Sequence, residues 1–248
     1  MKVLGVDVGG SGIKTAIIDT TTGELCSERL RVATPKPATP TAVAEAFKQL
    51  LEMHQWKDGL IGVGFPAIIS NGIARTAANV DDTWIGTNIE EIFGKVSGCP
   101  VIALNDADAA GIAEMRLGLG KERKGTVLLL TIGTGIGSAL FTDGQLVRNS
   151  ELGHIRMFNE SAEKYVSDSA RKRDELSWEE FGKRFNEYLL YIQRTFFPEL
   201  VLLGGGISKK FHKYEQYFTV DFEVQPAHFR NKAGAIGAAM YAKEVYNP

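Results

Sequence analysis

Two stretches of this chain follow the same plan of strand, glycine turn and strand. In residues 2–33, apolar runs flank the turn Gly9-Gly10-Ser11-Gly12. In residues 126–147, apolar runs flank Gly133-Thr134-Gly135, and Asp143-Gly144 closes a further hairpin. The repetition predicts two related halves that face each other.

The composition is that of an ordinary globular protein. The 248 residues are 44% hydrophobic and 23% charged, which is enough to bury one large core or two small ones. The net charge of −2 argues against nucleic acid or an anionic membrane as a partner. No apolar run approaches the roughly 20 residues of a membrane span. Because the chain has only Cys26 and Cys99 and no signal-peptide pattern, we expect a cytoplasmic protein.

A polar pair follows one of the predicted buried strands. Val101 to Leu104 are apolar, Asn105-Asp106 come next, and a small-residue helical pattern follows. A carboxylate at the carboxyl end of a strand lies where open α/β sheets bind their ligands. We interpret Asp106 as the group that acts on an acceptor molecule. The alternative is a helix cap, a common role of acidic residues, and the two roles can coexist on Asp106 and Asp108.

Both glycine turns have the composition of a phosphate-binding loop. The first lies in Asp7-Val8-Gly9-Gly10-Ser11-Gly12-Ile13-Lys14, and the second in Thr131-Ile132-Gly133-Thr134-Gly135-Ile136-Gly137-Ser138. Glycine lets backbone N–H groups approach an anion without a Cβ in the way. Asp7 is a candidate to hold Mg²⁺ through water, since this ion prefers carboxylate oxygens and keeps its hydration shell. A plain hairpin turn explains either loop alone, but two equivalent loops can hold one phosphate chain from both sides.

Two other groups of polar residues suit a sugar. Glu151-Leu152-Gly153-His154 places a carboxylate and an imidazole around a glycine, which fits adjacent sugar hydroxyls better than zinc, an ion that needs more ligands. The loop with Asn79, Asp82 and Trp84 offers an amide, a carboxylate and an aromatic surface. The alternatives are a structural histidine and a polar turn around a partly buried tryptophan.

Three basic clusters lie in the second half of the chain. They are Arg171-Lys172-Arg173, Lys209-Lys210 with Lys213, and Arg230 with Lys232. Each cluster alone is typical of a solvated surface. Together, after the second glycine turn, they favour a track for a long phosphate chain.

In their order and spacing, these motifs resemble the ROK sugar kinases. That family has an α/β, actin/hexokinase-like (ribonuclease H-like) two-lobed fold with duplicated mixed-sheet cores. The resemblance covers essentially the whole chain and rests on Asp7 to Lys14, Asn105-Asp106, Thr131 to Gly137, Glu151 to His154 and Leu203 to Ser208. The branch of polyphosphate glucokinases is similar at Thr131 to Ser138, Asp168 to Arg173, Ser177 to Glu180 and Gly204 to Lys210.

The resemblance implies a role for each motif residue. Asp106 would be the base on the 6-hydroxyl of glucose, and the sugar would be bound by Asn79, Asp82, Asn105, Asp106, Glu151 and His154. Mg²⁺ and the phosphoryl donor, polyphosphate or ATP, would be held by Asp7, Gly9, Gly10, Ser11, Gly12, Lys14, Thr131, Gly133, Thr134, Gly135, Gly137, Gly204, Gly205 and Gly206. The last three also lie where ATP-using members place adenosine. Only the family resemblance leads us to expect a homodimer.

The resemblance also implies how the chain is divided. One lobe would contain residues 1–105 with the C-terminal helix 235–248, and the other residues 106–234, with glucose in a cleft whose closure excludes water. Many members carry a cysteine cluster with structural zinc after the Glu-x-Gly-His motif. Residues 155–180 contain no cysteine, so we expect no zinc.

Other functions stay open at this point. The repressor branch of the family places a winged helix before the first strand, for which Met1 leaves no room, so we expect an enzyme. An ATP-dependent kinase for another hexose or an N-acetyl sugar would share every motif. A sugar sensor or an actin-like assembly protein without catalytic activity would keep the glycine turns and need no base.

Overall fold

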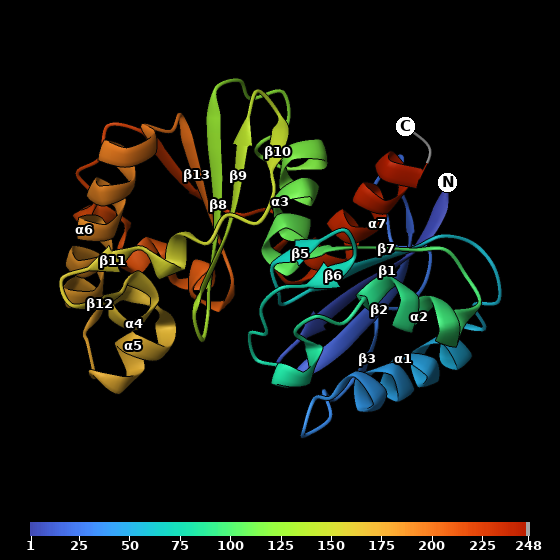
Figure 1. The fold of residues 1–248 in the computed structure, drawn as a ribbon. Helices are drawn as coiled ribbons and strands as arrows, with labels where there is room; N and C mark the ends of the chain where they lie inside the picture. Colours follow the sequence, from blue (N-terminus) through green and yellow to red (C-terminus); the bar gives the residue numbers. More distant parts are fainter. Residues whose placement is uncertain (247–248) are drawn as a thin grey trace. The chain divides into compact units, whose positions relative to one another are not determined.

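The computed structural model describes residues 1–246, and its chain contacts divide it into two units (Figure 1). The first unit is Met1–Ala113 together with the chain from Lys232 onward, and the second is Glu114–Asn231. The boundary expected after Asn105 falls inside the first unit, which continues along helix α3 (Asp106–Leu117). The reason is packing, because Gly237 of α7 (Ala233–Tyr246) lies against the Ala109 carbonyl of α3. Residues 247–248 of the expected last helix lie outside the described part.

The first unit is built on a five-stranded mixed sheet with the order β3-β2-β1-β4-β7. These strands are β1 (Lys2–Gly9), β2 (Gly12–Asp19), β3 (Leu30–Val32), β4 (Ile61–Phe65) and β7 (Val101–Asn105). The meander β1-β2-β3 is antiparallel, whereas β1, β4 and β7 run parallel. The third strand is only three residues long, and Leu25, farther upstream, makes an isolated bridge to Ile18.

Helices cover both faces of this sheet (Figure 1). On one face, α1 (Pro40–His54) and α2 (Ile89–Ser97) pack their apolar side chains against alternate residues of β1 and β4, while α7 lies on the other face. The caps follow sequence rules: Asn88 accepts a hydrogen bond from the Glu91 amide, and α2 stops at the left-handed Gly98. Short strands β5 (Ile69–Ser70) and β6 (Ile73–Ala74) form a hairpin around Asn71-Gly72, a pair typical of tight turns.

The second unit repeats the plan, with a mixed sheet in the order β10-β9-β8-β13-β14. Its strands are β8 (Thr126–Ile132), β9 (Ile136–Thr142), β10 (Gln145–Val147), β13 (Leu200–Gly204) and β14 (Glu223–Pro226). Again an antiparallel meander is followed by parallel strands. The duplicated mixed-sheet cores that the family resemblance implies are therefore confirmed.

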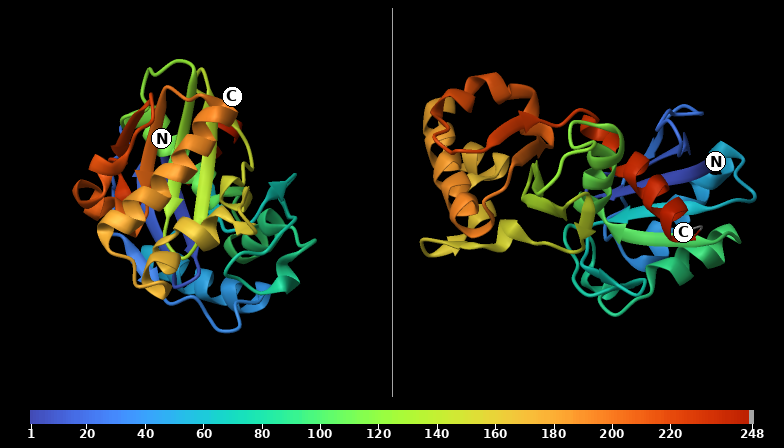
Figure 2. Two further views of the ribbon diagram at one scale, coloured as in Figure 1. Left: turned by 90° about the vertical axis from the view of Figure 1, so that its left-hand side faces the viewer. Right: turned by 90° about the horizontal axis from the view of Figure 1, so that it is seen from above.

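The long helix α6 (Trp178–Phe196) crosses one face of the second sheet (Figure 2, left). It begins at a capping box formed by Ser177 and Glu180, and it buries Phe181, Phe185 and Leu189 against the strands. Shorter elements complete the unit: η2 (Leu152–His154), β11 (Arg156–Met157), β12 (Glu160–Ser161), α4 (Ala162–Val166), α5 (Asp168–Arg173), η3 (Gly206–Lys213), η4 (Glu215–Tyr217) and η5 (Arg230–Lys232), the last of which reaches the unit boundary. No helix within residues 1–246 combines the length and the apolar character needed to cross a membrane.

Candidate functional site

The first glycine turn closes the β1–β2 hairpin of the first unit. Gly9 pairs with Gly12, so Gly10 and Ser11 form the exposed two-residue turn. The Gly9 carbonyl accepts a hydrogen bond from the Thr34 hydroxyl, and the Ser11 carbonyl accepts one from Arg31, with 2.6 Å between Nη2 and O. Because both carbonyl oxygens already accept a hydrogen bond, their partial negative charge repels an approaching anion less. The turn is therefore suited to bind phosphate.

Arg31 is a residue of this site that the motif analysis missed. It lies on β3 opposite Lys14 of β2, so two cations stand side by side next to the turn. A Cβ on Gly12 would lie only 2.5 Å from Nε of Arg31, so glycine is needed there for the guanidinium to reach Ser11. The pairing register of the meander is the only sequence signal that could have revealed this contact.

Asp7 and Lys14 face each other across the β1–β2 pair and form an ion pair of 2.8 Å. Both side chains are largely covered. Mg²⁺ is usually held by one or two carboxylates, its own waters and substrate phosphates. The single carboxylate of Asp7 fits that kind of site. Among residues 1–246, however, no group of three or more His, Cys, Asp or Glu side chains is arranged to hold a metal ion.

The junction of β7 and α3 lies at the same edge of the first sheet as Asp7. Asp7, Gly64 and Leu104 are in register on β1, β4 and β7, which run parallel. With about 4.8 Å between neighbouring strands, Leu104 lies about 10 Å from Asp7. Asp106, two residues beyond Leu104, therefore lies at the carboxyl edge of the sheet, where the sequence predicted a ligand.

Asn105, rather than Asp106, is the main cap of α3. Its Oδ1 accepts hydrogen bonds from the amides of Ala107 (2.8 Å) and Asp108 (3.1 Å), and its Nδ2 donates to the carbonyl of Ala67 (3.1 Å). Asp106 is half-buried at the first helical position, where its Oδ1 lies 2.9 Å from the Ala107 amide. The capping explanation for the Asn-Asp pair thus applies chiefly to the buried Asn105.

The predicted sugar-binding residues of the loop with Asn79 and Asp82 lie in different surroundings. Asn79 packs against Gly10 of the first glycine turn, which brings these two predicted residues together. Asp82 is exposed at the start of η1 (Asp82–Trp84). Trp84 is fully buried, with its indole N–H bound to the Ala38 carbonyl, so the aromatic surface proposed for a sugar is wrong. Its ring belongs to the core of the first unit, because it packs against Phe65 with 4.5 Å between ring centroids.

The second glycine turn joins β8 and β9, and the third turn, Gly204–Gly206, packs against it. Gly205 has a positive φ of 78°, and a Cβ there would clash with the backbone of Ile132. The Gly133 carbonyl accepts a hydrogen bond from the Ser169 amide of α5 at 3.3 Å. Two of the three predicted phosphate-binding turns are thus brought together in the second unit.

The Glu-x-Gly-His segment is fixed on strand β9. The Ser138 hydroxyl donates to the Ser150 carbonyl at 2.7 Å and accepts from the Leu152 amide at 2.9 Å. Gly153 lies against the Ile136 carbonyl, next to the second glycine turn. The local sequence therefore places the side chains of Glu151 and His154 beside the end of β9.

Glu163 of α4 adds a second carboxylate to the group formed by Glu151 and His154. The sequence motifs did not indicate this residue. Its Oε1 lies 3.9 Å from Nε2 of His154, and its Oε2 lies against Gly135. Burial raises the pKa of Glu151 above its ordinary value of 4.5; the charge of His154 opposes this shift, and the like charge of Glu163 adds to it. No local sequence pattern indicates Glu163, because it reaches the second glycine turn only when the β11–β12 hairpin reverses the direction of the chain.

The basic clusters differ in their surroundings. Within α5, Arg171 and Lys172 pair with Asp168 at 3.2 and 2.6 Å, and Arg173 pairs with Asp174 at 2.7 Å. Every member of the first cluster is therefore engaged in an ion pair. Arg230 and Lys232 lie in η5, and Lys209, Lys210 and Lys213 are exposed in η3.

Comparisons with known proteins agree over nearly the whole chain. A family model described as ROK family matches residues 3–164. The polyphosphate glucokinase of Mycobacterium tuberculosis is 43% identical over 237 residues, covering 95% of this chain and 89% of that protein. The crystal structure of inorganic polyphosphate/ATP-glucomannokinase from Arthrobacter sp. strain KM is 44% identical, with a TM-score of 0.94 over 98% of this chain and 99% of that chain.

A ROK family glucokinase from Streptomyces griseus, crystallised with glucose and AMPPNP, resembles the chain in fold alone. Its TM-score is 0.83 at 22% identity, over 98% of this chain and 100% of that chain. These likenesses confirm the actin/hexokinase-like fold expected from the sequence.

Proposed function

The chain belongs to the ROK family, and we propose that it is a polyphosphate glucokinase, which transfers a phosphoryl group from inorganic polyphosphate to the 6-hydroxyl of glucose. One observation carries this proposal. The two relatives at 43% and 44% identity both span nearly the full chain, and both are named for the use of polyphosphate. The geometry of the site supports the same reaction.

We propose Asp106 as the general base of this reaction. Its position at the start of α3 orients the carboxylate, because one oxygen accepts a hydrogen bond from the Ala107 amide. The carboxylate would accept the proton of the 6-hydroxyl as the oxygen attacks the terminal phosphorus and the bond to the rest of the donor breaks. General-base catalysis typically contributes about 10²–10⁴-fold to the rate.

The residues that we propose for glucose binding are polar side chains that can bond to ring hydroxyls. Glu151, His154 and Glu163 form one group of acceptors and donors suited to adjacent ring hydroxyls. From the first unit we propose Asn79, Asp82 and the second amide hydrogen of Asn105, whose other amide hydrogen is used toward Ala67.

The glycine turns would bind the donor phosphates through backbone N–H groups, assisted by Lys14. Phosphoryl transfer depends mainly on alignment and on stabilising charge on the donor oxygens. Mg²⁺ would supply part of that positive charge, and the Asp7 carboxylate would hold the ion through water. Lys14 would keep Asp7 in place through their 2.8 Å ion pair.

Three finer features complete the proposal. We propose ATP as a second donor, because the Gly204–Gly206 turn packs against the second glycine turn and so can extend one donor site. We propose a homodimer on the family resemblance alone. We also propose a cytoplasmic location, on the basis of the free cysteines Cys26 and Cys99.

An assay of sugar phosphate formation, which detects the phosphate of each sugar supplied, tests this function. Glucose is supplied with long-chain polyphosphate or with ATP, and mannose and N-acetylglucosamine serve as comparison sugars. We expect turnover of glucose with polyphosphate, and a steep fall in this activity with added salt, as contacts to a polyanion require. Activity with ATP and none with polyphosphate would overturn the donor. Glucose binding without turnover by either donor would favour a sugar sensor.

A further inference from the structure

The 3-10 helix η3 begins at the turn that packs against the second glycine turn. Gly205 lies against the Ile132 backbone, one residue before Gly133, and η3 runs from Gly206 to Lys213. The Ser208 hydroxyl donates to the Gly205 carbonyl at 2.8 Å, which fixes the start of η3 to this turn. A phosphate chain held at the second glycine turn can therefore continue directly onto η3.

The exposed positive charge of η3 lies in its later part, from Lys209 to Lys213. Lys209, Lys210 and Lys213 are exposed, and η3 itself contains no acidic residue. Among residues 1–246, neither Lys209 nor Lys210 takes part in an ion pair, whereas the basic residues of α5 pair with Asp168 and Asp174. The charge of these two lysines is thus available to a ligand.

Trp178 links this surface to α5. Lys213 Nζ lies 5.8 Å from the centre of the indole ring, and Arg171 Cζ lies 4.5 Å from the same centre. Tyr214 stacks on the same indole at 5.9 Å. The indole thereby fixes the distal end of η3, so that its cations stand on an ordered support.

We propose that η3, through Lys209, Lys210 and Lys213, binds the distal part of a polyphosphate chain whose reacting end lies at the glycine turns. This inference rests on the proposed function and deepens it, because it assigns a binding site to the part of the donor that extends beyond the reacting phosphate. Repeated cations along one segment match repeated anions along one chain. At about 2 Å per residue, Lys213 lies roughly 16 Å along η3 from the turn at Gly205, so a donor that reaches it from the turn is longer than the triphosphate of ATP.

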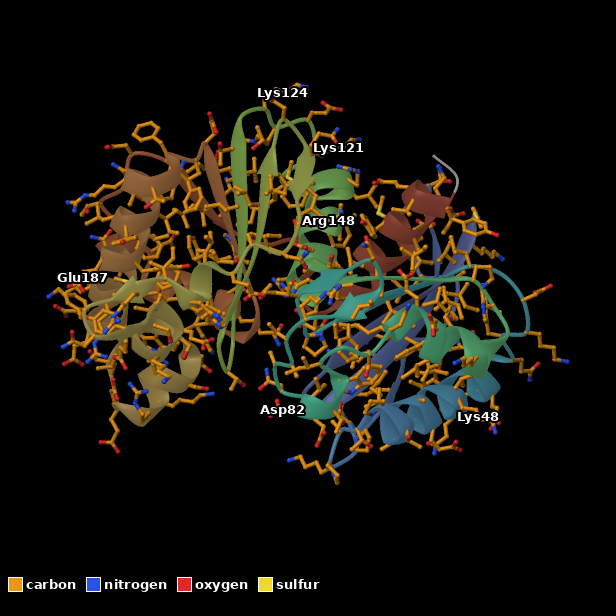
Figure 3. The ribbon with its side chains drawn as sticks, in the orientation of Figure 1. Lys48, Asp82, Lys121, Lys124, Arg148 and Glu187 are labelled. Atoms are coloured by element: carbon orange, nitrogen blue, oxygen red, sulfur yellow. The ribbon has the colours of Figure 1, made fainter. Side chains whose placement is uncertain are left out.

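The second glycine turn lies at one end of strand β8, and a matched pair of lysines lies at the other end. Lys121 and Lys124 precede β8, whereas the second glycine turn follows it, and seven strand residues separate the two ends by about 20 Å. Figure 3 labels both lysines at that end of the second unit. The double variant Lys121→Ala/Lys124→Ala therefore makes the same change of charge far from η3.

The experiment measures binding of long-chain polyphosphate by calorimetry, without a sugar, to the wild type and to the two double variants. For Lys209→Ala/Lys210→Ala we expect at least tenfold weaker binding. We also expect the slope of log K against log salt to be smaller by about two, one for each lost phosphate contact. Binding of tripolyphosphate should weaken by less than threefold, because a short chain stays at the turns. Lys121→Ala/Lys124→Ala should bind both chains as the wild type does.

Three outcomes would overturn the inference: wild-type binding by the η3 variant, equal losses in the two double variants, or an equal loss for tripolyphosphate. The measurement needs no turnover, so it separates this inference from the proposed function. A protein that binds long chains through η3 but does not phosphorylate glucose with them would overturn only the proposed reaction. A protein that does phosphorylate glucose with polyphosphate, yet needs neither lysine for binding, would overturn only the role of η3.

Discussion

Arg31 donates a hydrogen bond of 2.6 Å to the carbonyl oxygen of Ser11, and so connects strand β3 to the first glycine turn. The Thr34 hydroxyl makes the corresponding bond to Gly9. The conformation of the turn is therefore set by residues that follow it by some twenty positions, in addition to its own glycines.

Replacement of Arg31 should weaken donor binding. Arg31→Ala removes this hydrogen bond and a positive charge beside the turn, so we expect it to raise the KM for polyphosphate by about tenfold or more. The KM for glucose should change by less than twofold. Arg31→Lys should be intermediate, because lysine keeps the charge and loses the planar fork of donors.

Lys48→Ala is the control for Arg31→Ala. Lys48 is an exposed cation on α1 of the same unit (Figure 3). Steady-state kinetics with each substrate varied in turn provides the measurement. An equal rise in both KM values for Arg31→Ala would mean that the variant distorts the unit as a whole, and our assignment of Arg31 to the donor turn would be wrong.

Asp106→Asn should remove turnover and keep the fold. Asparagine keeps the size of the side chain and an oxygen for the Ala107 amide, but it cannot accept a proton at neutral pH. We expect kcat to fall by about 10²–10⁴-fold, with glucose affinity by calorimetry within about threefold of the wild type. A nearly normal kcat would exclude Asp106 as the base.

Asn105→Ala should give the opposite result, with a loss of stability. Asn105 is buried, and its side chain makes three hydrogen bonds to backbone groups of Ala67, Ala107 and Asp108. Loss of a helix cap costs about 0.5–2 kcal/mol, and the uncovered polar groups add to this. Urea unfolding should therefore show a lower free energy of unfolding for Asn105→Ala than for Asp106→Asn. Equal stability of the two variants would contradict the division of roles.

The local features of the fold could be predicted from the sequence because they depend on near neighbours. The two glycine hairpins, the cap at Asn88 and the capping box at Ser177 each act within a few residues. Trp84 shows where such reasoning fails. The three residues before it, Asp81, Asp82 and Thr83, are polar, yet its ring packs on Phe65 and its N–H bonds to Ala38, contacts set by the tertiary fold.

The residues of the candidate site could also be predicted where they lie in one local motif, and not where distant segments of the chain bring them together. Asn105-Asp106 and Glu151 to His154 stand in recognisable motifs. Arg31 and Glu163 do not, because a strand register and a hairpin bring them to the glycine turns. The pairing of Arg171 and Lys172 with Asp168 follows ordinary helical spacing and could have been recognised from the sequence.

The pH dependence of glucose use should report the raised pKa of Glu151. Its ionised form accepts hydrogen bonds from sugar hydroxyls in our proposal, so binding is lost as pH falls through its pKa. Because burial raises that pKa above 4.5, kcat/KM for glucose should begin to fall at a higher pH than for an ordinary carboxylate.

At acid pH, the profile of kcat/KM for glucose has a declining part, its acid limb. Two variants should shift this acid limb in opposite directions. Glu163→Gln removes the like charge that raises the pKa of Glu151, so the limb should shift to lower pH. His154→Gln removes the charge that lowers the same pKa, so the limb should shift to higher pH. The position of the limb, rather than the height of the profile, is the readout. Shifts of the same sign would show that Glu151 does not control it.

The final prediction concerns the stability of the first unit at acid pH, through His54. Its Nε2 lies 2.9 Å from the hydroxyl oxygen of Thr15, a fully buried residue of β2. Burial lowers the pKa of His54 from 6.5, and the contact with Thr15 only partly opposes this shift. The folded state therefore binds fewer protons than the unfolded state below about pH 6.5, so stability rises with pH in that range and is lost as pH falls.

Thermal unfolding at a series of pH values tests this role of His54. We expect the wild-type midpoint to fall between about pH 7.5 and 5, and to fall less in His54→Gln, which keeps a polar group near Thr15 and does not titrate. The comparison uses the pH dependence of each protein, so an overall loss of stability in the variant does not affect it. If both proteins lose stability equally over this range, the protonation of His54 does not contribute to acid unfolding.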